Sequence, residues 1–442
     1  MFFRLLWLLP IAALAGSLSL PAQEVKLRPA SDFLAAEQGV QQGTTESELV
    51  TRALATNPTL LAQRQQIEMA KGSATQARLR KNPLLTLGGL KEVNGSDNQF
   101  NIDGSLPLEL YGRRGRRTEV AERKKDVTQQ SVADQERLLS GDVRTRFGEA
   151  LASIRNLLFA EQLLQVNRNF LKLMDDRVRE GAIPSLDANE VRVEVSRIES
   201  LRIDYQAKAE IALLALKEAV GVDPEETIRL KGALELAPLA YDQKQLLQLA
   251  AGHRPDLTVQ RANVALANAQ LRLDRAEGKP DASIFGGYER PSSGFSQRAF
   301  DAAGNLSPIR QTFNYATFGL DISLPLLNRN QGAAVADTAA IRAARNQVAA
   351  VDLNLRHEVA QNLVRFSGAQ ARLAVYRTGV RDQASRNLDV VRQAYSYGRT
   401  TFLDVIAEQR RYIDIETGYT DILLGAYVAR IALEQAVGTN LP

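Results

Sequence analysis

The sequence predicts a mainly α-helical protein with a smaller β part, in which long coiled-coil helices and four amphipathic strands are shared between several copies of the chain. Three observations support this fold class. The chain contains a long internal repeat, each repeat contains a proline-free segment with heptad spacing, and each repeat also contains a pair of strands with period-two alternation.

The repeat is about 215 residues long, and its two copies make up nearly all of the chain after the N-terminal region. We place the first copy at 46–221, a linker at 222–242, the second copy at 243–438 and a C-terminal tail at 439–442. The aligned segments are 57–60 with 254–257, 100–107 with 318–325, 181–187 with 398–404, and 219–221 with 436–438. The second copy gains 21 residues between Pro280 and Asp321. Because added length is tolerated best in exposed loops, we expect a free loop over 291–311.

Each repeat is predicted to contain, in order, a helix, two strands, a very long helix and a further helix. The helices are expected over 46–80, 114–180 and 184–220, and over 243–278, 331–397 and 401–437. The long helices are predicted by apolar residues at heptad or three-to-four spacing without proline. These residues are Val143, Ala150, Leu157, Leu164, Leu171 and Val178, and Val348, Val351, Leu355, Val359, Leu363 and Phe366. At 1.5 Å per residue, each rod is about 100 Å long.

The strand pairs are expected within 84–110 and 281–325. Apolar and polar residues alternate over 100–108 and over 318–324, which fits a half-buried sheet or a membrane barrel wall with a watery lumen. Four strands cannot close a barrel, since about eight are needed to enclose a filled interior. Open strand edges in a membrane would leave backbone groups unpaired. A cyclic oligomer that shares one barrel and one helical tube satisfies both constraints.

The N-terminal residues indicate export. Arg4 precedes an apolar run from Leu5 to about Leu20, which is typical of a signal peptide over residues 1–22, followed by an N-terminal extension over 23–45. The chain has no cysteine, so we expect neither disulfides nor a lipid on a processed N-terminal cysteine. No other uninterrupted apolar stretch has the length of a membrane-spanning helix.

The charge balance argues against a nucleic-acid partner. The 55 basic and 51 acidic residues are interspersed, which gives a net charge of +4. The one dense basic cluster, Arg113 to Arg117, has no interleaved aromatic residues and is followed by Glu119 and Glu122. We interpret it as the solvated or headgroup-facing start of a helix.

The order of elements, the duplication, the Leu-Pro at the end of each strand pair and the Gly-x-x-x-x-Leu-Asp segments resemble the TolC outer-membrane efflux family over about 46–438. Two stretches, 106–117 and 324–332, are similar to its heavy-metal branch, the cobalt-zinc-cadmium (CzcC-like) channels. The resemblance implies a homotrimer with a 12-stranded β-barrel in the outer membrane of a Gram-negative-type bacterium and a periplasmic helical tunnel. It also implies a periplasmic adaptor protein and an inner-membrane RND-type pump as partners.

The resemblance places a channel gate at the helix-to-helix connections. Asp404 matches a gate aspartate, Asp187 is its equivalent in the first repeat, and Tyr395 matches a tyrosine that ties the helices together. From the residues alone, Asp404 can instead cap a helix with Thr401, because a Ser/Thr-x-x-acid box favours a helix start. Tyr395 can instead be a core residue.

Two further groups of residues are candidates by position. Gly181 and Gly398 are expected to be left-handed C-caps of helices. The resemblance implies that the connections around these two glycines contact the adaptor. The residues implied in this contact are Gly181, Ile183, Gly398, Thr401 and Leu403. Pro107 and Pro325 end strands, as proline must, and the resemblance places the transition from barrel to tunnel there. Gly112 and Gly115 are expected to relax that transition.

We expect no enzyme activity, cofactor or dedicated metal site. The sequence has no nucleophile elbow or phosphate loop, and its two histidines, His253 and His357, lie far apart without ligand spacing. The predicted function is an outer-membrane exit duct for heavy-metal cations. The alternatives are a duct for drugs or other organic compounds, or a soluble periplasmic coiled-coil adaptor or scaffold.

Overall fold

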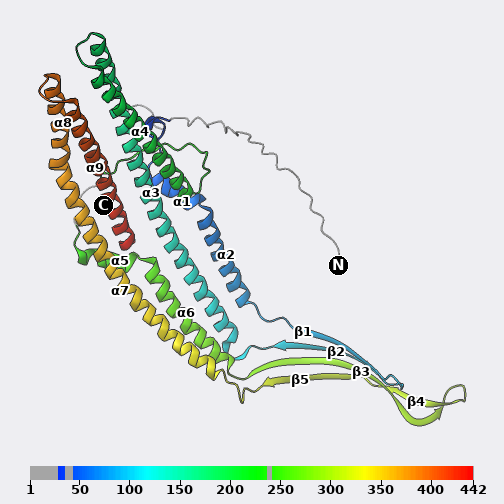
Figure 1. The fold of residues 1–442 in the computed structure, drawn as a ribbon. Helices are drawn as coiled ribbons and strands as arrows, with labels where there is room; N and C mark the ends of the chain where they lie inside the picture. The colour runs from blue at the N-terminus through cyan, green and yellow to red at the C-terminus, as the bar shows by residue number, and fades with distance from the viewer. Residues whose placement is uncertain (1–27, 35–42, 236–240, 442) are drawn as a thin grey trace, which may run out of the picture.

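The computed structural model describes residues 28–34, 43–235 and 241–441 of the chain. Long helices occupy one end of the molecule, and a curved antiparallel sheet extends from the other (Figure 1). The mainly helical fold with a smaller sheet confirms the predicted fold class. The predicted signal peptide lies outside the described residues, as do parts of the N-terminal extension and of the linker.

The helices occur in the same order in both repeats. In the first they are α1 (Glu46–Thr56), α2 (Pro58–Arg78), α3 (Arg113–Arg179) and α4 (Ser185–Val220). In the second they are α5 (Gln243–His253), α6 (Pro255–Glu277), α7 (Gln331–Val375), a π-helical turn (Tyr376–Val380), α8 (Arg381–Ser396) and α9 (Phe402–Val437). Short 3₁₀ helices lie at Ala30–Asp32 and Leu110–Gly112.

Three of the predicted helices are interrupted where the sequence pattern predicts a continuous helix. The single helices expected over 46–80 and 243–278 are each two helices, because Pro58 and Pro255 occupy the first position of a new helix and the residue before each is extended. The long helix expected over 331–397 is interrupted by the π-helical turn, whereas α3 runs for 67 residues without a break.

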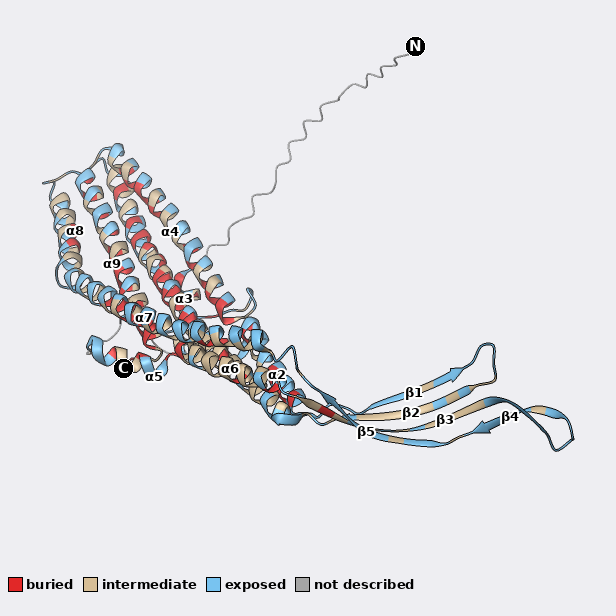
Figure 2. Cartoon of the chain, turned by 90° about the horizontal axis from the view of Figure 1, so that it is seen from below, coloured by how far each residue is buried: buried red, intermediate tan, exposed pale blue. Residues whose placement is uncertain are grey.

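The predicted apolar stripe of α3 forms the core of the helical part. Val143, Ala150 and Leu157 are fully buried in a cluster that also contains residues of α1, α4 and α9, and Leu164 belongs to a second cluster nearer the hairpin ends. In the second repeat Leu355, Val359 and Phe366 are buried against α5 and α9. In Figure 2 the buried residues gather on the facing sides of the helices. Within the described residues, no helix has the length and apolar character needed to cross a membrane.

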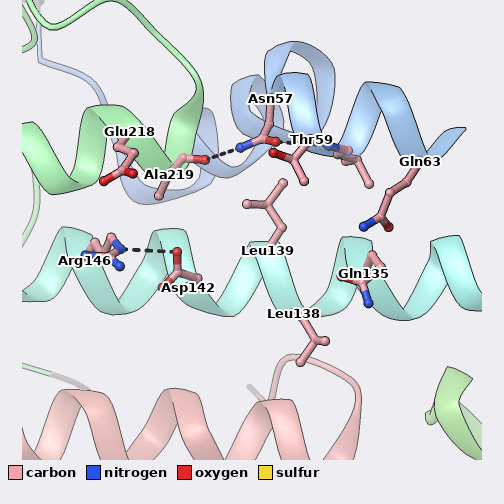
Figure 3. Close-up of a pocket in the computed structure, with 11 residues that line it drawn as sticks. Asn57, Thr59, Gln63, Gln135, Leu138, Leu139, Asp142, Arg146, Glu218 and Ala219 are labelled. Carbon is pink, nitrogen blue, oxygen red and sulfur yellow. Dashed lines mark hydrogen bonds and ion pairs between the residues drawn. The ribbon is translucent and has the colours of Figure 1, made fainter.

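Equivalent side chains join the helices in the two repeats. The Asn57 amide donates to the Ala219 carbonyl at 2.9 Å and thereby ties the α1–α2 break to the end of α4 (Figure 3). The Arg254 guanidinium donates to the Ala436 carbonyl at 3.0 Å at the equivalent place in the second repeat. Arg254 is buried and also binds Asp256 and Glu358, each within 2.8 Å. In each repeat, this hydrogen bond therefore holds the proline-induced break against the end of the last helix.

The sheet contains β1 (Leu84–Lys91), β2 (Asn98–Pro107), β3 (Asp281–Phe300), β4 (Leu306–Thr312) and β5 (Tyr315–Ser323). β1 pairs with β2, β2 with β3, and β3 with both β5 and β4, all antiparallel. The inner part of β3 pairs with β5 and its outer part with β4, so β4 and β5 together act as one strand. Among the described residues, the outer edges of β1 and β5 have no strand partner, and the sheet of one chain is open.

The prediction of a free loop over 291–311 is wrong. This segment continues β3, turns at Asp301–Asn305 and returns as β4, so the added residues lengthen a hairpin (Figure 1). β2 pairs with β3 only as far as Ser292, so the rest of β3 and β4 form a two-stranded ribbon beyond the other strands. The two strands of this ribbon contain β-forming side chains, which favour extension of the hairpin. They are Phe295 to Phe300 and Leu306 to Thr312.

Candidate functional site: the hairpin ends, the sheet faces and the junction between them

The connections between the long helices are built by glycine. Gly181 and Gly398 have φ of +73° and +69°, which only glycine adopts without a steric penalty. At the first connection the Gly181 amide binds the Val178 carbonyl and the Ala182 amide binds the Arg177 carbonyl; the second repeats both bonds. This pattern is the Schellman C-cap. The predicted left-handed caps are therefore present, with Ile183 half-buried beside one and Leu403 exposed beside the other.

Asp404 caps the first turn of α9. Its Oδ2 accepts hydrogen bonds from the Thr400 hydroxyl at 2.5 Å and from the hydroxyl and amide of Thr401 at 2.7 and 2.9 Å. The hydrogen bonds from Thr400 and Thr401 lower the pKa of the Asp404 carboxyl. The expected capping box is therefore present. The carboxylate remains exposed, so the capping role leaves it available to solvent.

Asp187 and Tyr395 lie at the join between the two helical hairpins. The Tyr395 ring packs edge-on against Phe170 of α3, and Phe402 of α9 stacks on the same Phe170 ring at 5.7 Å. Burial, and then the charge of Asp187, raises the pKa of the Tyr395 hydroxyl. This aromatic cluster, Phe170, Tyr395 and Phe402, connects α3 of the first hairpin to α8 and α9 of the second.

The first junction between sheet and helices is a left-handed turn held by charged side chains. Pro107 is the last residue of β2, and the chain then passes through Glu109, Tyr111 and Gly112, which all have positive φ, before α3 begins. Gly115 lies inside the first turn of α3 and is not part of this turn. The turn therefore extends over residues 109–112, whereas the sequence predicted that Gly112 and Gly115 relax this transition.

Two arginines of the basic cluster fix this junction. The Arg113 guanidinium pairs with Asp281 at 2.7 Å, and the Leu110 amide binds the other oxygen of the same carboxylate at 2.9 Å. Arg117 pairs with Glu109 at 2.5 Å and also donates to main-chain carbonyls at the end of α2. The interpretation of the whole cluster as solvated is thus wrong for Arg113 and Arg117.

The second junction repeats this turn with a different residue. Asn330 precedes α7 with φ of +55°, in the place that Gly112 occupies before α3, since 330 is 112 plus 218. The side-chain amide of Asn330 donates to the main-chain carbonyl of Asp274 in α6 at 3.1 Å. Pro325 follows the end of β5, two residues after Ser323. Asparagine tolerates left-handed geometry better than other residues with a side chain, and the repeat alignment could have identified it.

The register separates the sheet into an apolar face and a mainly polar face, which also carries Leu84, Leu90 and Phe285. Cross-strand partners share a face, so Leu87, Ile102, Tyr288 and Ala316 lie in one row. The other apolar members of this face are Leu85, Phe100, Leu106, Ile284, Phe318, Leu320 and Ile322, and all are exposed in the single chain, up to 88% for Phe318. The apolar face therefore needs an apolar environment that one chain does not provide.

The polar face has an acidic character that the sequence analysis did not extract. The register places Asp103, Glu289 and Asp321 on this face, which holds no lysine or arginine within the described strands. Asp103 accepts a hydrogen bond from Asn101 at 2.6 Å and lies beside Gly287, where a Cβ would collide with its carboxylate. Counting the charges of each strand face separately could have revealed this pattern from the sequence.

No metal-binding group of three or more His, Cys, Asp or Glu side chains occurs in the part of the chain that the structure describes. His253 ends α5, where its ring nitrogen lies 2.9 Å from the Leu249 carbonyl.

The sequence profile of the family described as "Outer membrane efflux protein" matches residues 49–222 and 246–439, which is most of the chain and both repeats. The chain belongs to the outer membrane efflux protein family. Its members are channel proteins, so the family agrees with the predicted duct.

Curated relatives span most of this chain at low identity. The cobalt-zinc-cadmium resistance protein CzcC of Cupriavidus metallidurans is 23% identical over 391 residues, covering 87% of this chain and 88% of CzcC. Nodulation protein T of Rhizobium leguminosarum bv. trifolii is 24% identical, with 85% and 78% covered. The nickel-cobalt-cadmium resistance protein NccC of Alcaligenes xylosoxydans xylosoxydans is 24% identical, with 70% and 67% covered.

The fold of this efflux family member is similar to solved channel structures. The structure of CusC, described in connection with folding and transmembrane channel formation, superposes with a TM-score of 0.71. The match covers 97% of this chain and 100% of that one at 18% identity. The arrangement of helices and sheet is therefore that of a known channel fold.

Proposed function

We propose that this chain is one protomer of a trimeric outer-membrane exit duct that passes heavy-metal cations in a tripartite RND-type efflux system. Three chains contribute their strands to one closed barrel in the outer membrane of a Gram-negative-type bacterium. Their helices form a periplasmic tunnel, which docks on an adaptor protein and, through it, on an inner-membrane pump.

The two-faced open sheet carries this proposal. An exposed apolar face on strands about ten residues long matches the 9–11 residues that a tilted membrane strand needs. Open edges are costly in a membrane, so further copies must complete the wall. The polar face then becomes the lumen lining, where Asp103, Glu289 and Asp321 give each copy three carboxylates besides Asp281, which is paired with Arg113. A lumen of this kind favours cations.

The acidic lining and the names of two relatives favour metal cations as cargo. CzcC and NccC are named for resistance to divalent transition metals. A duct for drugs or other organic compounds is the alternative, since nodulation protein T is a relative whose name contains no metal. A soluble periplasmic scaffold would leave the apolar sheet face in water, which the hydrophobic effect disfavours.

The hairpin ends supply the gate and the adaptor contacts in this proposal. Trimer formation brings three copies of Asp404 around the axis, with Asp187 and Tyr395 at the join behind them. The adaptor contacts the connections at Gly181 and Ile183 and at Gly398, Thr401 and Leu403. The Schellman caps present these connections as compact, exposed ends, and Pro107, Pro325 and Gly112 set the angle of the tunnel to the barrel.

Ion selectivity in a planar bilayer tests the function. The purified protein is expected to form channels that pass potassium in preference to chloride, measured as a reversal potential in a salt gradient. The combined variant D103N/E289Q/D321N should lose most of this preference while its conductance remains. A protein that forms no channels would contradict the proposed function, and an unchanged selectivity in the variant would contradict the role of the sheet carboxylates.

Metal cargo is tested separately in cells. Deleting the gene should raise sensitivity to zinc, cobalt and cadmium, and the native gene should restore resistance. A deletion strain that becomes sensitive only to organic toxins would replace metals by organic compounds as the cargo, and the channel assignment would stand.

A further inference from the structure

The outer end of the apolar sheet face is basic. Arg290 follows Tyr288 on this face of β3, and its neighbours in the register are Phe100 and, on the next row, Asn98 and Lys91. Arg310 on β4 pairs with Gly294, two rows beyond Arg290 on the same face of the ladder. Cross-strand partners and residues two apart share a face. Lys91, Arg290 and Arg310 therefore lie on the same face of the sheet, on β1, β3 and β4.

Arg298 joins the same group through β4. It pairs with Pro308, which is two residues from Arg310 and hence on the same face, although β3 has an irregularity between Gly294 and Arg298. The next pair on this face is Phe300 with Leu306, whose side chains are 74% and 53% exposed. The ribbon thus continues the outward face of the sheet as a basic segment that ends in an apolar pair.

We call these four basic side chains the basic band. They are exposed, and no acidic side chain among the described residues neutralises them. Lys91, Arg290, Arg298 and Arg310 form no ion pair with any residue that the structure describes. The rest of the band face is uncharged: Asn98, Ser292, Gly294, Pro308 and Thr312.

The nearby acids accept main-chain hydrogen bonds or lie on the other face, and Glu92, next to Lys91, accepts from the Asp97 amide at 3.2 Å. The Asp97 carboxylate accepts from the Gly294 amide at 2.7 Å, and Asp301 accepts from the Ala303 and Asn305 amides at 2.9 Å. Glu289 lies on the opposite face of the sheet. The sheet therefore separates charge, with acids inside and bases outside.

We propose that the basic band binds the phosphate groups of lipid headgroups at the outer surface of the membrane. This inference depends on the proposed function, because it places the apolar face in lipid and the band at the adjoining headgroup level. Arginine matches phosphate geometry with paired donors, and basic side chains beside an apolar membrane surface attract anionic headgroups. A closed trimer presents twelve such side chains around its rim.

Binding of a phosphorylated lipid to the purified protein tests this proposal. Fluorescent lipid A with two phosphates is titrated into the detergent-solubilised full-length protein. The variant K91Q/R290Q/R298Q/R310Q is compared with the charge-matched control K124Q/R261Q/R342Q/R345Q, whose exposed residues lie on the helices. We expect at least tenfold weaker binding for the band variant and native affinity for the control. Equal binding by both variants would overturn the proposal.

Two further arms use the native protein and do not depend on the folding of a variant. Dephosphorylated lipid A should bind at least tenfold more weakly than the diphosphorylated form, and equal binding would refute a phosphate site. Millimolar inorganic phosphate should not displace the lipid, and full displacement would indicate a free-phosphate site in place of a lipid site. Channel formation in a planar bilayer is measured in parallel, so failure of the proposed function is recognised separately from failure of lipid binding.

Discussion

At the residue scale, Asp404 combines a structural and a proposed functional role. Its carboxylate accepts three hydrogen bonds from Thr400 and Thr401 and remains exposed at the end of the second hairpin. An asparagine at this position keeps an acceptor for the helix start but removes the charge. The substitution therefore separates capping from charge.

We expect Asp404→Asn to weaken block of the channel by a trivalent cation at least tenfold, because three clustered carboxylates attract multivalent cations and three amides do not. Single-channel recording with the cation on the helical side measures the block. Glu180→Gln, which removes an exposed acid from the other hairpin end, is the control and should be blocked like the native channel. If Asp404→Asn is blocked as tightly as the native channel, Asp404 does not line the constriction.

A second residue-scale prediction concerns pH. Burial, together with a hydrogen bond and the charge of Asp274, raises the pKa of the Asp337 carboxyl to about 6, between α6 and α7. A raised pKa in the folded state means that this site stabilises the fold at low pH. That contribution is complete below the ordinary value of 3.8 and is lost as the pH rises through about 6.

Asp337→Asn should therefore raise the thermal unfolding temperature at pH 8 and change it little at pH 4. Circular dichroism of the detergent-solubilised protein at both pH values measures this difference. Asp352→Asn, in the same helix but in an exposed ion pair with Arg356, is the control. An equal effect of Asp337→Asn at both pH values would show that the two carboxylates do not share this linkage.

At the element scale, the sheet hairpin of the second repeat has two separable parts. The inner part of β3 pairs with β2 and β5, whereas residues beyond Gly294 pair only with β4. Replacing residues 295–309 with Asn-Gly joins Gly294 to its partner Arg310 by a two-residue turn suited to hairpins.

The shortened protein should insert and conduct like the native channel, because every pairing between β2, β3 and β5 is retained. It should also bind diphosphorylated lipid A more weakly, because Arg298 is removed. Planar-bilayer conductance and the lipid titration measure the two effects. Loss of trimer or conductance would mean that the ribbon is part of the wall.

Sequence patterns predicted the long elements well and their interruptions poorly. Heptad spacing located α3 because one apolar stripe repeats along it, and Val143, Ala150 and Leu157 are indeed buried. The breaks before Pro58 and Pro255 carried a local signal, since proline disfavours a helix in the residue before it. The π-helical turn at Tyr376–Val380 contains no proline, and the spacing of apolar residues does not report a local shift of the hydrogen-bond pattern.

The candidate site was predicted in part for the same reason. Gly181, Gly398 and Thr401 are local features, and the structure gives them the expected capping geometry. Asn330 at the second junction and Arg113 with Asp281 depend on contacts across the fold, which one segment cannot reveal. The prediction of a loop over 291–311 depends on the added length alone, whereas the β-forming residues of this segment favour a longer hairpin.

At the scale of the whole molecule, the two open edges of the sheet and the exposed apolar residues of the helices both require further copies of the chain. β1 and β5 are the outer strands of a sheet that one chain leaves open. The long helices also expose apolar residues, among them Val335, Val364 and Val375 of α7, away from the core of the single chain. Sharing with copies around an axis resolves both features at once.

Cysteine cross-linking between β1 and β5 tests this sharing most directly, since the chain has no cysteine of its own. A cysteine at Leu87 is combined in turn with one at Ala316, Phe318, Leu320 or Ile322, which lie on the same face of the sheet as Leu87. Several partners are needed because a disulfide requires Cβ atoms about 4 Å apart and the register between copies is to be found. Under oxidation, at least one pair should give a covalent three-chain species on a non-reducing gel, and none larger. A water-soluble protein that stays monomeric for every pair would contradict the shared wall.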